Sequence, residues 1–433
     1  MTLEFFGFLL YLIPLVLVLY FYLRRHKKKE RRHVAQLKET VASGLTEPAS
    51  LHPVFDPIRC LGSGACVTAC PEQAIGLIKG KGHLVNPTVC IGHGACSAAC
   101  PHDAITLVFG TAKRGMDIPQ VNPNFETNVP GIFIAGELGG MGLIRKAVEQ
   151  GCQAMESIRQ RQGGNFPLDV VIAGAGPAGL AATLMALEHK LRFITIEQED
   201  SFGGTVYHYP RNKIVMTAPM QLPIVGTVKM TETSKEALLE FWQGVVTKTG
   251  LKVNFNERLE AIGRNGNGFT VKTSRGSYHT RTVLLTIGRR GTPRKLEVPG
   301  EELSKVVYRL IDPGQYRQQH VLVVGGGDSA LEAALAIAAE PGTTVTLSYR
   351  SDAFGRVKEK NRQRLQEAEK QGRIKVLLKS NVKKIELDKV TIEHAGKMAE
   401  IKNNTVIVSA GGVLPTPFLK EIGVMVETKY GTA

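Results

Sequence analysis

Six of the seven cysteines in this chain of 433 residues stand in two short runs that repeat each other. The runs read CLGSGACVTACPEQAI and CIGHGACSAACPHDAI, and matching positions are 30 residues apart. The repeated thiols are Cys60, Cys66 and Cys70 in the first run and Cys90, Cys96 and Cys100 in the second. Seven cysteines are too few for a disulfide scaffold of this length, whereas clustered thiolates bind metals well. The repeat therefore predicts a metal or redox centre.

The two runs resemble the bacterial two-cluster ferredoxins over about residues 54–110. In that family each run reads C-x2-C-x2-C-x3-C-P, and the fourth cysteine ligates the other cluster. The second cysteine is missing from both runs here, where Ser63 and His93 stand instead. The resemblance implies one site of Cys60, Cys66, Cys100 and Ser63, and a second site of Cys90, Cys96, Cys70 and His93.

The altered positions leave the nature of the two sites open. Imidazole replaces a thiolate in known iron–sulfur centres, whereas a serine alkoxide is a poorer ligand. We expect 4Fe–4S or 3Fe–4S clusters, with the serine-containing site the more labile. A ferredoxin fold without clusters, or with zinc in their place, is the alternative.

A glycine-rich loop at residues 174–179 follows a hydrophobic strand pattern and precedes an alanine-rich helix. The loop reads Gly174-x-Gly176-x-x-Gly179, and the next strand pattern, FITIE, ends at Glu197. An acid about 20 residues after such a loop suits the ribose hydroxyls of a dinucleotide. Strand, loop, helix and acid together predict a Rossmann-like domain.

A second loop of the same kind begins after the strand pattern HVLVV, with Gly325, Gly327 and Ala330 at the glycine positions. Its second strand pattern ends at Arg350 instead of an acid, and Arg356 follows shortly after. Cations at this place suit a 2′-phosphate, so NADPH is favoured over NADH.

Two such domains in tandem resemble the thioredoxin-reductase-like flavoproteins over residues 118–433, where the first domain holds FAD and the second NAD(P)H. Residues 129–157 resemble the closing FAD motif of that family, with Glu137 where the family has Asp. This motif normally follows the nucleotide domain but here precedes both, which indicates a circular permutation. The expected cofactor contacts are Gly174, Gly176, Gly179, Glu197, Gly204, Gly136, Glu137, Arg145, Lys146, Ala147, Gly325, Gly327, Ala330, Arg350 and Arg356.

Relatives of that family that reduce disulfides carry a cysteine pair near the flavin, and this chain does not. Residues 160–433 contain no cysteine, and Cys152 stands alone on a predicted helix, where a buried small residue is expected. The composition therefore excludes thiol–disulfide exchange by a resident dithiol. The polar residues from Tyr207 to Lys213 either line the flavin or form a surface loop.

The N-terminus predicts a membrane anchor. Phe5 to Leu23 is an uncharged run of 19 residues, followed by RRHKKKERR at 24–32. A helix of that length reaches about 28 Å, and the basic flank places the remaining chain in the cytoplasm. We therefore expect a single-pass protein of the inner, cytoplasmic membrane.

The composition bounds the remaining function classes. Hydrophobic residues make up 43% and charged residues 21%, which excludes disorder, collagen and coiled coil as the main architecture. The net charge of +15 drops to about +9 without the basic flank, so nucleic-acid binding is disfavoured and acidic redox partners are favoured.

The predicted fold class is α/β, with two Rossmann-like domains and a small α+β ferredoxin-like domain after one transmembrane helix. The expected order is a transmembrane helix (1–24), a basic flank and linker (25–53), the ferredoxin-like domain (54–112), the closing FAD segment (113–163), the FAD domain (164–293), the NAD(P) domain (294–414) and a return to the FAD domain (415–433).

The predicted function is electron transfer between NAD(P)H, FAD and two iron–sulfur clusters, and from there to a redox protein or a quinone. No general acid–base constellation is visible, and hydride transfer from nicotinamide to flavin needs none. A flavin enzyme that reduces a small acceptor directly and a membrane-tethered redox sensor are the alternatives. A homodimer is compatible with the sequence, and the electron acceptor and direction are not specified by it.

Overall fold

The computed structural model describes residues 2–42, 45–48, 51–92, 94–112, 114–140, 142–161, 164–209, 211, 213–289, 291–355 and 357–431. The side chains of residues 2–11, 216 and 292 lie outside this description. The chain divides into two compact units, residues 1–108 and residues 109–432.

Unit 1 opens with the long helix α1 (Thr2–Ala42), where the sequence predicted a linker over residues 33–53. The second half of α1 packs on the hairpin of β2 (Ile75–Ile78) and β3 (Lys81–Leu84). Shielded positions 33, 37 and 40 recur at helical spacing, which gives this stretch one buried face. The linker prediction for residues 33–42 is therefore wrong, because packing on the hairpin stabilises the helix.

Backbone groups of the hairpin region bond to this helix. The Leu77 N–H donates to His33 Nδ1 (3.1 Å), and the Lys79 N–H donates to Glu30 Oε1 (2.7 Å). The Thr40 hydroxyl donates to the Val85 carbonyl oxygen (3.0 Å). These bonds connect the basic segment directly to the cysteine-containing unit.

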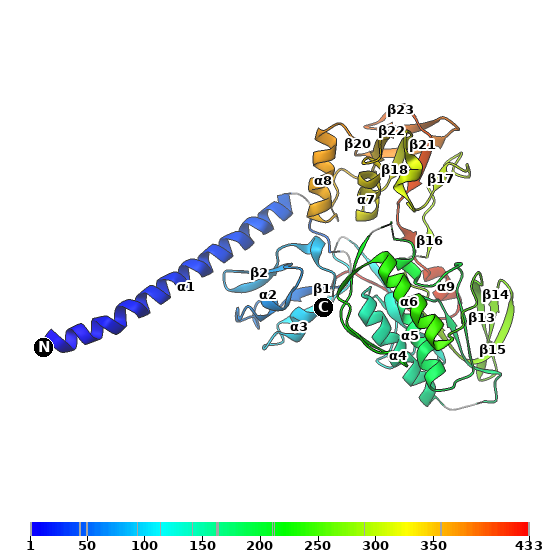
Figure 1. Cartoon of the computed structure of the whole chain (residues 1–433), viewed down its shortest axis with the longest axis horizontal. Coiled ribbons are helices and arrows are strands. Elements are labelled where there is room, and N and C mark those ends of the chain that lie inside the picture. Colours follow the sequence, from blue (N-terminus) through cyan, green and yellow to red (C-terminus); the bar gives the residue numbers. More distant parts are fainter. Residues whose placement is uncertain are drawn as a thin grey trace. The chain divides into compact units, whose positions relative to one another are not determined.

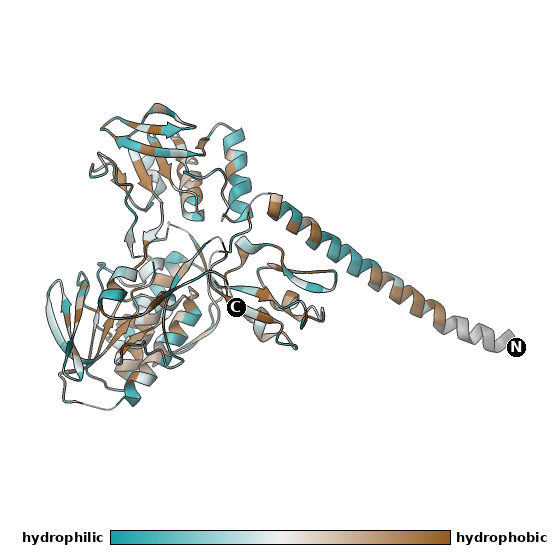
Figure 2. Ribbon diagram, turned by 180° about the vertical axis from the view of Figure 1, so that it is seen from behind, coloured by the Kyte–Doolittle hydropathy of each residue, from teal (hydrophilic) through white to brown (hydrophobic). Residues whose placement is uncertain are grey.

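The predicted membrane helix is corrected by the structure. Within the described residues, no helix is long and apolar enough to cross a membrane. Figure 2 shows that the apolar part of α1 passes into a hydrophilic stretch. The side chains at 1–11, where the predicted run begins, lie outside the description. Single-pass anchoring in the cytoplasmic membrane, and with it the expected cytoplasmic orientation, is not supported.

The remainder of unit 1 is a small α+β domain with an internal repeat. Each cysteine run forms a short helix that is followed by a strand. Strand β1 pairs antiparallel with β4, and β2 pairs antiparallel with β3. The further elements are β1 (His52–Phe55), α2 (Ala65–Ala69), η1 (Pro87–Val89), α3 (Ala95–Ala98) and β4 (Ile105–Val108).

Unit 2 contains a first Rossmann-like sheet in the strand order β13-β14-β15-β7-β8, with β6 added beside β15. Figure 1 labels β13, β14 and β15 of this sheet. Strands β6, β15, β7 and β8 run parallel, and β13 and β14 form an antiparallel extension. The strands are β6 (Ile132–Ile134), β7 (Leu168–Ala173), β8 (Phe193–Ile196), β13 (Leu259–Asn265), β14 (Gly268–Thr273) and β15 (Gly276–Leu285). The helices around it are η2 (Gly136–Gly139), α4 (Ile144–Gln160), α5 (Pro177–Glu188), η3 (Gly204–Val206) and α6 (Lys235–Thr249). Short strand pairs are formed by β9 (Ile214–Met216) with β12 (Glu232–Ser234) and by β10 (Met220–Leu222) with β11 (Gly226–Val228).

The predicted closing FAD segment, called the displaced segment below, is described over residues 114–140 and 142–161 and contributes to this sheet. Its strand β6 pairs with β15 in the register Ile132 to Val283, and its helix α4 packs on α5. Strand β26 (Val426–Lys429) from the far end of the chain pairs with β5 (Met116–Pro119). The end of the chain therefore lies beside the start of the displaced segment.

The second Rossmann-like sheet has five parallel strands in the order β17-β24-β18-β19-β20. The chain enters this part through β16 (Thr292–Pro293) and leaves through β25 (Gly412–Val413), which pair with each other. Its elements are β17 (Val306–Val307), η4 (Pro313–Tyr316), β18 (His320–Val324), α7 (Asp328–Ile337), β19 (Thr344–Ser348), α8 (Glu359–Lys370), β20 (Ile374–Leu377) and β24 (Thr405–Val408). An antiparallel meander of β21 (Ser380–Ile385), β22 (Lys389–His394) and β23 (Lys397–Lys402) extends it, and α9 (Thr416–Glu421) follows.

Candidate functional site

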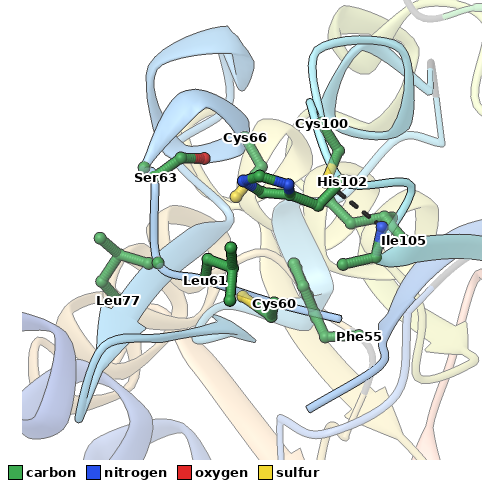
Figure 3. A pocket seen from close by; sticks show the side chains of 12 residues that line it. Phe55, Cys60, Leu61, Ser63, Cys66, Leu77, Cys100, His102 and Ile105 are labelled. Carbon is green, nitrogen blue, oxygen red and sulfur yellow. Dashed lines mark hydrogen bonds between the residues drawn. The ribbon is translucent and has the colours of Figure 1, made fainter. Parts of the chain in front are cut away.

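The first cysteine site is assembled from both runs. Cys60 comes from the loop after β1, Cys66 from α2, and Cys100 from the turn after α3. These thiols line one pocket together with Ser63 and His102 (Figure 3). Cys100 of the second run therefore lines the same pocket as Cys60 and Cys66 of the first run.

The tight loop before α2 depends on glycine. Gly62 and Gly64 both have φ of +74°, a left-handed conformation that side chains disfavour. A Cβ atom at Gly62 would lie 2.3 Å from the Gly80 carbonyl oxygen. The loop can therefore approach the β2–β3 hairpin closely only because this residue has no side chain.

Backbone N–H groups point at the sulfur atoms. Gly82 donates to Cys60 Sγ (3.3 Å), Ala104 to Cys100 Sγ (3.4 Å) and Ala74 to Cys70 Sγ (3.4 Å). Such bonds stabilise negative charge on sulfur, which a thiolate ligand carries.

The thiols of the first site are electrostatically coupled. Burial raises the pKa of the Cys66 thiol, and the neighbouring thiols of Cys60 and Cys100 raise it further. Three thiolates gathered in one pocket therefore need compensating positive charge, which the iron ions of a cluster provide.

The second site shows the same arrangement. Burial raises the pKa of the Cys90 thiol, and the charges of Cys70 and Glu72 raise it further. Burial also raises the pKa of the Cys96 thiol, to which Cys90 and Cys70 contribute. Cys90, Cys96 and Cys70 thus influence one another electrostatically, whereas His93 lies outside the described residues.

The arrangement of the described thiols is compatible with an iron–sulfur group. Among the described residues, no three His, Cys, Asp or Glu side chains converge closely enough to hold one metal ion. A tetrahedral zinc site needs four ligand atoms at about 2.0–2.3 Å from one centre. Shared pockets, buried thiols and N–H groups directed at sulfur are features that a larger iron–sulfur group requires.

The first glycine loop has the close contacts that a dinucleotide fold needs. A Cβ atom at Gly174 (φ +107°) would lie 2.6 Å from the Thr286 carbonyl oxygen, and one at Gly179 would lie 1.8 Å from the Gly174 carbonyl oxygen. Gly204 faces Gly176 across the loop, since its Cβ would lie 3.1 Å from Gly176 Cα. The strand, the loop and the start of α5 can pack this tightly only with glycine.

The Glu197 carboxylate lies beside this loop. It is 7% exposed, and its Oε2 accepts from the Ala175 N–H (2.7 Å) while Oε1 accepts from the Glu199 N–H (3.1 Å). Burial raises the pKa of this carboxyl group, although the two backbone donors oppose that rise. The acid predicted for the ribose is thus positioned by the loop that would bind the phosphates.

The displaced segment places its predicted residues in two different settings. The Gly136 N–H donates to Gln150 Oε1 (2.9 Å), and Ala147 is buried against α5. Arg145 and Lys146 begin α4, and both pair with Glu149 at 2.7 and 2.8 Å. One carboxylate therefore contacts both cations and balances only one of the two positive charges.

Arg289 is a residue that the sequence reasoning missed. Its Nη2 donates to the Asp117 carbonyl oxygen (2.9 Å), while its Nη1 is buried without a hydrogen-bond partner among the described residues. Burial lowers the pKa of this guanidinium, and the carboxylates of Glu137 and Asp117 oppose that change. The only sequence signal is its place directly after LLTIG. A buried donor without a partner, beside Glu137, is suited to a bound cofactor, and the residues of this domain fit FAD.

The second glycine loop has the same close backbone contacts, and the Tyr349 ring packs against it. A Cβ at Gly325 would lie 2.4 Å from the Ser409 carbonyl oxygen, and Ala330 is fully buried. A Cβ at Gly326 would lie 2.2 Å from the Tyr349 ring. Around Gly327, at the start of α7, the described neighbours leave open space. The predicted contact Arg350 is exposed after β19, and Arg356 lies outside the described residues.

The polar loop after Gly204 contacts the nucleotide domain. Lys213 pairs with Glu332 on α7, and His208 contacts Arg309. The Lys235 ammonium donates to the Tyr209 carbonyl oxygen (2.7 Å). These contacts give His208 and Lys213 a structural role between the two Rossmann-like sheets, and Arg211 is exposed.

The sequence of unit 2 matches a known family. The model of the pyridine nucleotide-disulphide oxidoreductases matches residues 171–432, which is more than half of the chain. The chain belongs to this family. A 4Fe-4S dicluster domain matches residues 52–101. The protein is thus a flavin-dependent oxidoreductase of the pyridine nucleotide-disulphide oxidoreductase family that carries a ferredoxin-like iron–sulfur domain.

The share of each relative's length that aligns with this chain differs from one relative to another. Bacilliredoxin reductase Bdr of Bacillus subtilis is 27% identical over 60% of this chain and 82% of its own length. Ferredoxin--NADP reductase of Levilactobacillus brevis is 33% identical over 43% of this chain and 54% of its own length, so this chain spans about half of that relative. Bacillithiol disulfide reductase Bdr of Staphylococcus aureus aligns in structure with a TM-score of 0.53 and 26% identity, over 61% of this chain and 84% of that one.

Proposed function

We propose that this chain passes electrons between NAD(P)H, FAD and its two cysteine sites, and exchanges them with a redox protein or a quinone. The observation that carries the proposal is the pocket of Cys60, Cys66 and Cys100, which stands in one chain with two dinucleotide-type loops. The relatives named ferredoxin--NADP reductase support it, because that name pairs NADP with a ferredoxin, and this chain has a ferredoxin-like domain of its own.

The residues of the chain supply binding and orientation. When bound, FAD takes a hydride from nicotinamide and releases electrons singly, and iron–sulfur clusters carry single electrons. Gly176 caps α5 without a side-chain hydrogen bond, which leaves backbone N–H groups for a pyrophosphate. Glu197 would accept hydrogen bonds from the ribose hydroxyls of a bound FAD, and the Arg289 Nη1, which has no partner among the described residues, would donate to it.

A resident dithiol has no part in this route. Cys152 is the only cysteine after residue 100. Its pKa is raised to about 11, chiefly by burial and then by Glu188 and Glu149, so its reactive thiolate is scarce at neutral pH. The proposal therefore separates this chain from disulfide reduction by a cysteine pair next to the flavin.

We also infer that the closing FAD segment was displaced by a circular permutation. Two strand pairings support this inference. Strand β6 of the displaced segment pairs with β15 of the FAD domain, and β5 pairs with β26, which follows the nucleotide domain. Because β26 lies beside β5 within unit 2, such a rearrangement is compatible with one fold.

The test is a redox titration of the anaerobically purified full chain. Iron, acid-labile sulfide and FAD are measured first, and NADPH is then added while visible spectra are recorded. We expect flavin bleaching and then loss of the broad iron–sulfur absorbance or, in the reverse direction, reoxidation of dithionite-reduced clusters by NADP. Clusters that exchange electrons with the nucleotide in neither direction would leave direct reduction of a small acceptor by FAD as the function.

A further inference from the structure

The pocket of the first cysteine site contains a residue that the ferredoxin pattern does not assign. His102 lines it together with Cys60, Cys66, Cys100 and Ser63. Figure 3 shows the imidazole ring directed into the pocket from the side of Cys100. We propose that His102, instead of Ser63, is the fourth protein ligand of the cluster at this site. This inference rests on the proposed function, since it requires that the site holds a cluster.

The internal repeat supports this placement. His102 stands two residues after Cys100, in the turn Cys100-Pro101-His102, and Glu72 has the same place after Cys70 and Pro71. Glu72 acts electrostatically on Cys90, so it lies near the second site. The repeat thus places a side chain that can bind a metal two positions after the exchanged cysteine in both halves of the domain, and His102 is the one that lines the described pocket.

The chemistry of the two candidate ligands differs. A serine hydroxyl must lose a proton far above its working pH before it binds iron, whereas a neutral imidazole binds through a nitrogen lone pair. Nitrogen ligands from histidine occur in known iron–sulfur centres. Among the described residues, no hydrogen bond or ion pair engages the His102 ring, so its nitrogen atoms are available.

The position of His102 also explains how a set of three cysteine ligands from two runs gains a fourth ligand. Cys60 and Cys66 belong to the first run, whereas Cys100 and His102 come from the second. A first site with two ligands from each run departs from the three-plus-one arrangement of the ferredoxin pattern, because His102 comes from the same run as the exchanged Cys100. The loss of the second cysteine of the first run is thereby compensated from the other half.

The test measures ligation directly instead of activity. The full chain is labelled with 15N-histidine in a His93→Ala background, so that a second-site histidine contributes no signal. Pulsed electron paramagnetic resonance then detects nitrogen coupled strongly to the reduced cluster. His102→Ala, His102→Cys and Ser63→Ala are compared, with His83→Ala as the control because His83 is exposed on β3 and does not line the pocket.

We expect the nitrogen coupling in the background, Ser63→Ala and His83→Ala proteins, and its loss in both His102 variants. His102→Ala should reduce iron at this site from four to three per cluster, and His102→Cys should keep four irons. Retention of the coupling in His102→Ala, or its loss in Ser63→Ala, would overturn the assignment while the electron-transfer proposal stands. Absence of iron and sulfide from the unaltered protein would overturn both.

Discussion

At the residue scale, the chemistry of this protein depends on which groups the fold leaves unsatisfied. The Arg289 Nη1 atom is buried without a partner among the described residues, and the second glycine loop has open space around Gly327. Most other polar groups near the loops are engaged, as Glu197 is by two backbone N–H groups. A bound cofactor gains the most binding free energy at such unsatisfied positions, since burying a donor without a partner costs roughly 1–3 kcal/mol.

Arg350 allows a test of nucleotide choice. Arg350→Ala should raise the Michaelis constant for NADPH at least about tenfold more than that for NADH, because a charge-assisted contact to the 2′-phosphate is removed. Steady-state kinetics with both nucleotides check this. Arg373→Ala is the matched control, since Arg373 is also exposed but precedes β20, whereas Arg350 follows the neighbouring parallel strand β19, so the two stand at opposite ends of the strands. Equal effects on both nucleotides would show that Arg350 does not contact the phosphate.

Cys152 allows a test of pH dependence. Its pKa is raised to about 11, chiefly by burial, so the folded state holds this proton more tightly than the unfolded state does. The stability that it contributes is therefore present below about pH 9 and is lost as the pH rises toward 11. Cys152→Ser, which does not titrate in this range, should show a smaller fall in Tm between pH 8.5 and 10.5. Parallel Tm curves for both proteins would contradict the assigned shift.

At the element scale, the packing of α4 on α5 decides whether the displaced segment can complete the FAD domain. Gly151 permits this approach, since a Cβ there would lie 2.2 Å from the Ala178 carbonyl oxygen. The buried side chains Met155 and Ile158 continue the same interface along α4. The contact is local in space but joins residues on either side of the first glycine loop.

Gly151→Ala should therefore destabilise unit 2 by about 1–3 kcal/mol and weaken FAD binding, because the added methyl group pushes α4 away from α5. Denaturant unfolding and flavin fluorescence measure the two effects. Gly244→Ala in α6 is the control, because a Cβ there meets no described atom within 4 Å. Replacing an exposed helical glycine should instead stabilise by about 0.5–1 kcal/mol. If both variants lose stability equally, close helix packing is not the cause.

At the scale of the whole molecule, pairings distant in sequence close the flavin domain. Strand β6 lies beside β15, and β5 lies beside β26, although each pair is far apart along the chain. Removal of residues 1–163 would expose one side of β15 and take α4 away from α5. The second Rossmann-like sheet, in contrast, is formed entirely from residues after 300.

A chain of residues 164–433 should therefore fold its nucleotide domain and bind NADPH, yet bind FAD at least about tenfold more weakly than the full chain. A chain of residues 109–433 is the control and should retain FAD, because it keeps β5, β6 and α4. Calorimetry with NADPH and equilibrium dialysis with FAD provide the measurements. Tight FAD binding by the shorter chain would refute the inferred permutation.

The sequence by itself determined the chemistry at those places where a local backbone conformation carries it. The glycine loops, the acid at Glu197 and the cysteine repeat are such places, because residue type and spacing within a few turns dictate their shape. Predictions from local sequence pattern were wrong at the N-terminus. The predicted membrane helix is unsupported, and residues 33–42 of the predicted linker form a helix that packs on β2. That packing depends on partners some 40 residues away, which no local pattern contains.

Only the tertiary structure decided which residues meet across the chain. It brought Cys100 and His102 to the first cysteine run, placed Arg289 beside Glu137, and laid the end of the chain against β5. Such contacts join segments far apart in sequence, and their selection depends on how buried surfaces pack in three dimensions. The residue types alone therefore predicted a redox protein, whereas only the fold determined how its ligands are arranged.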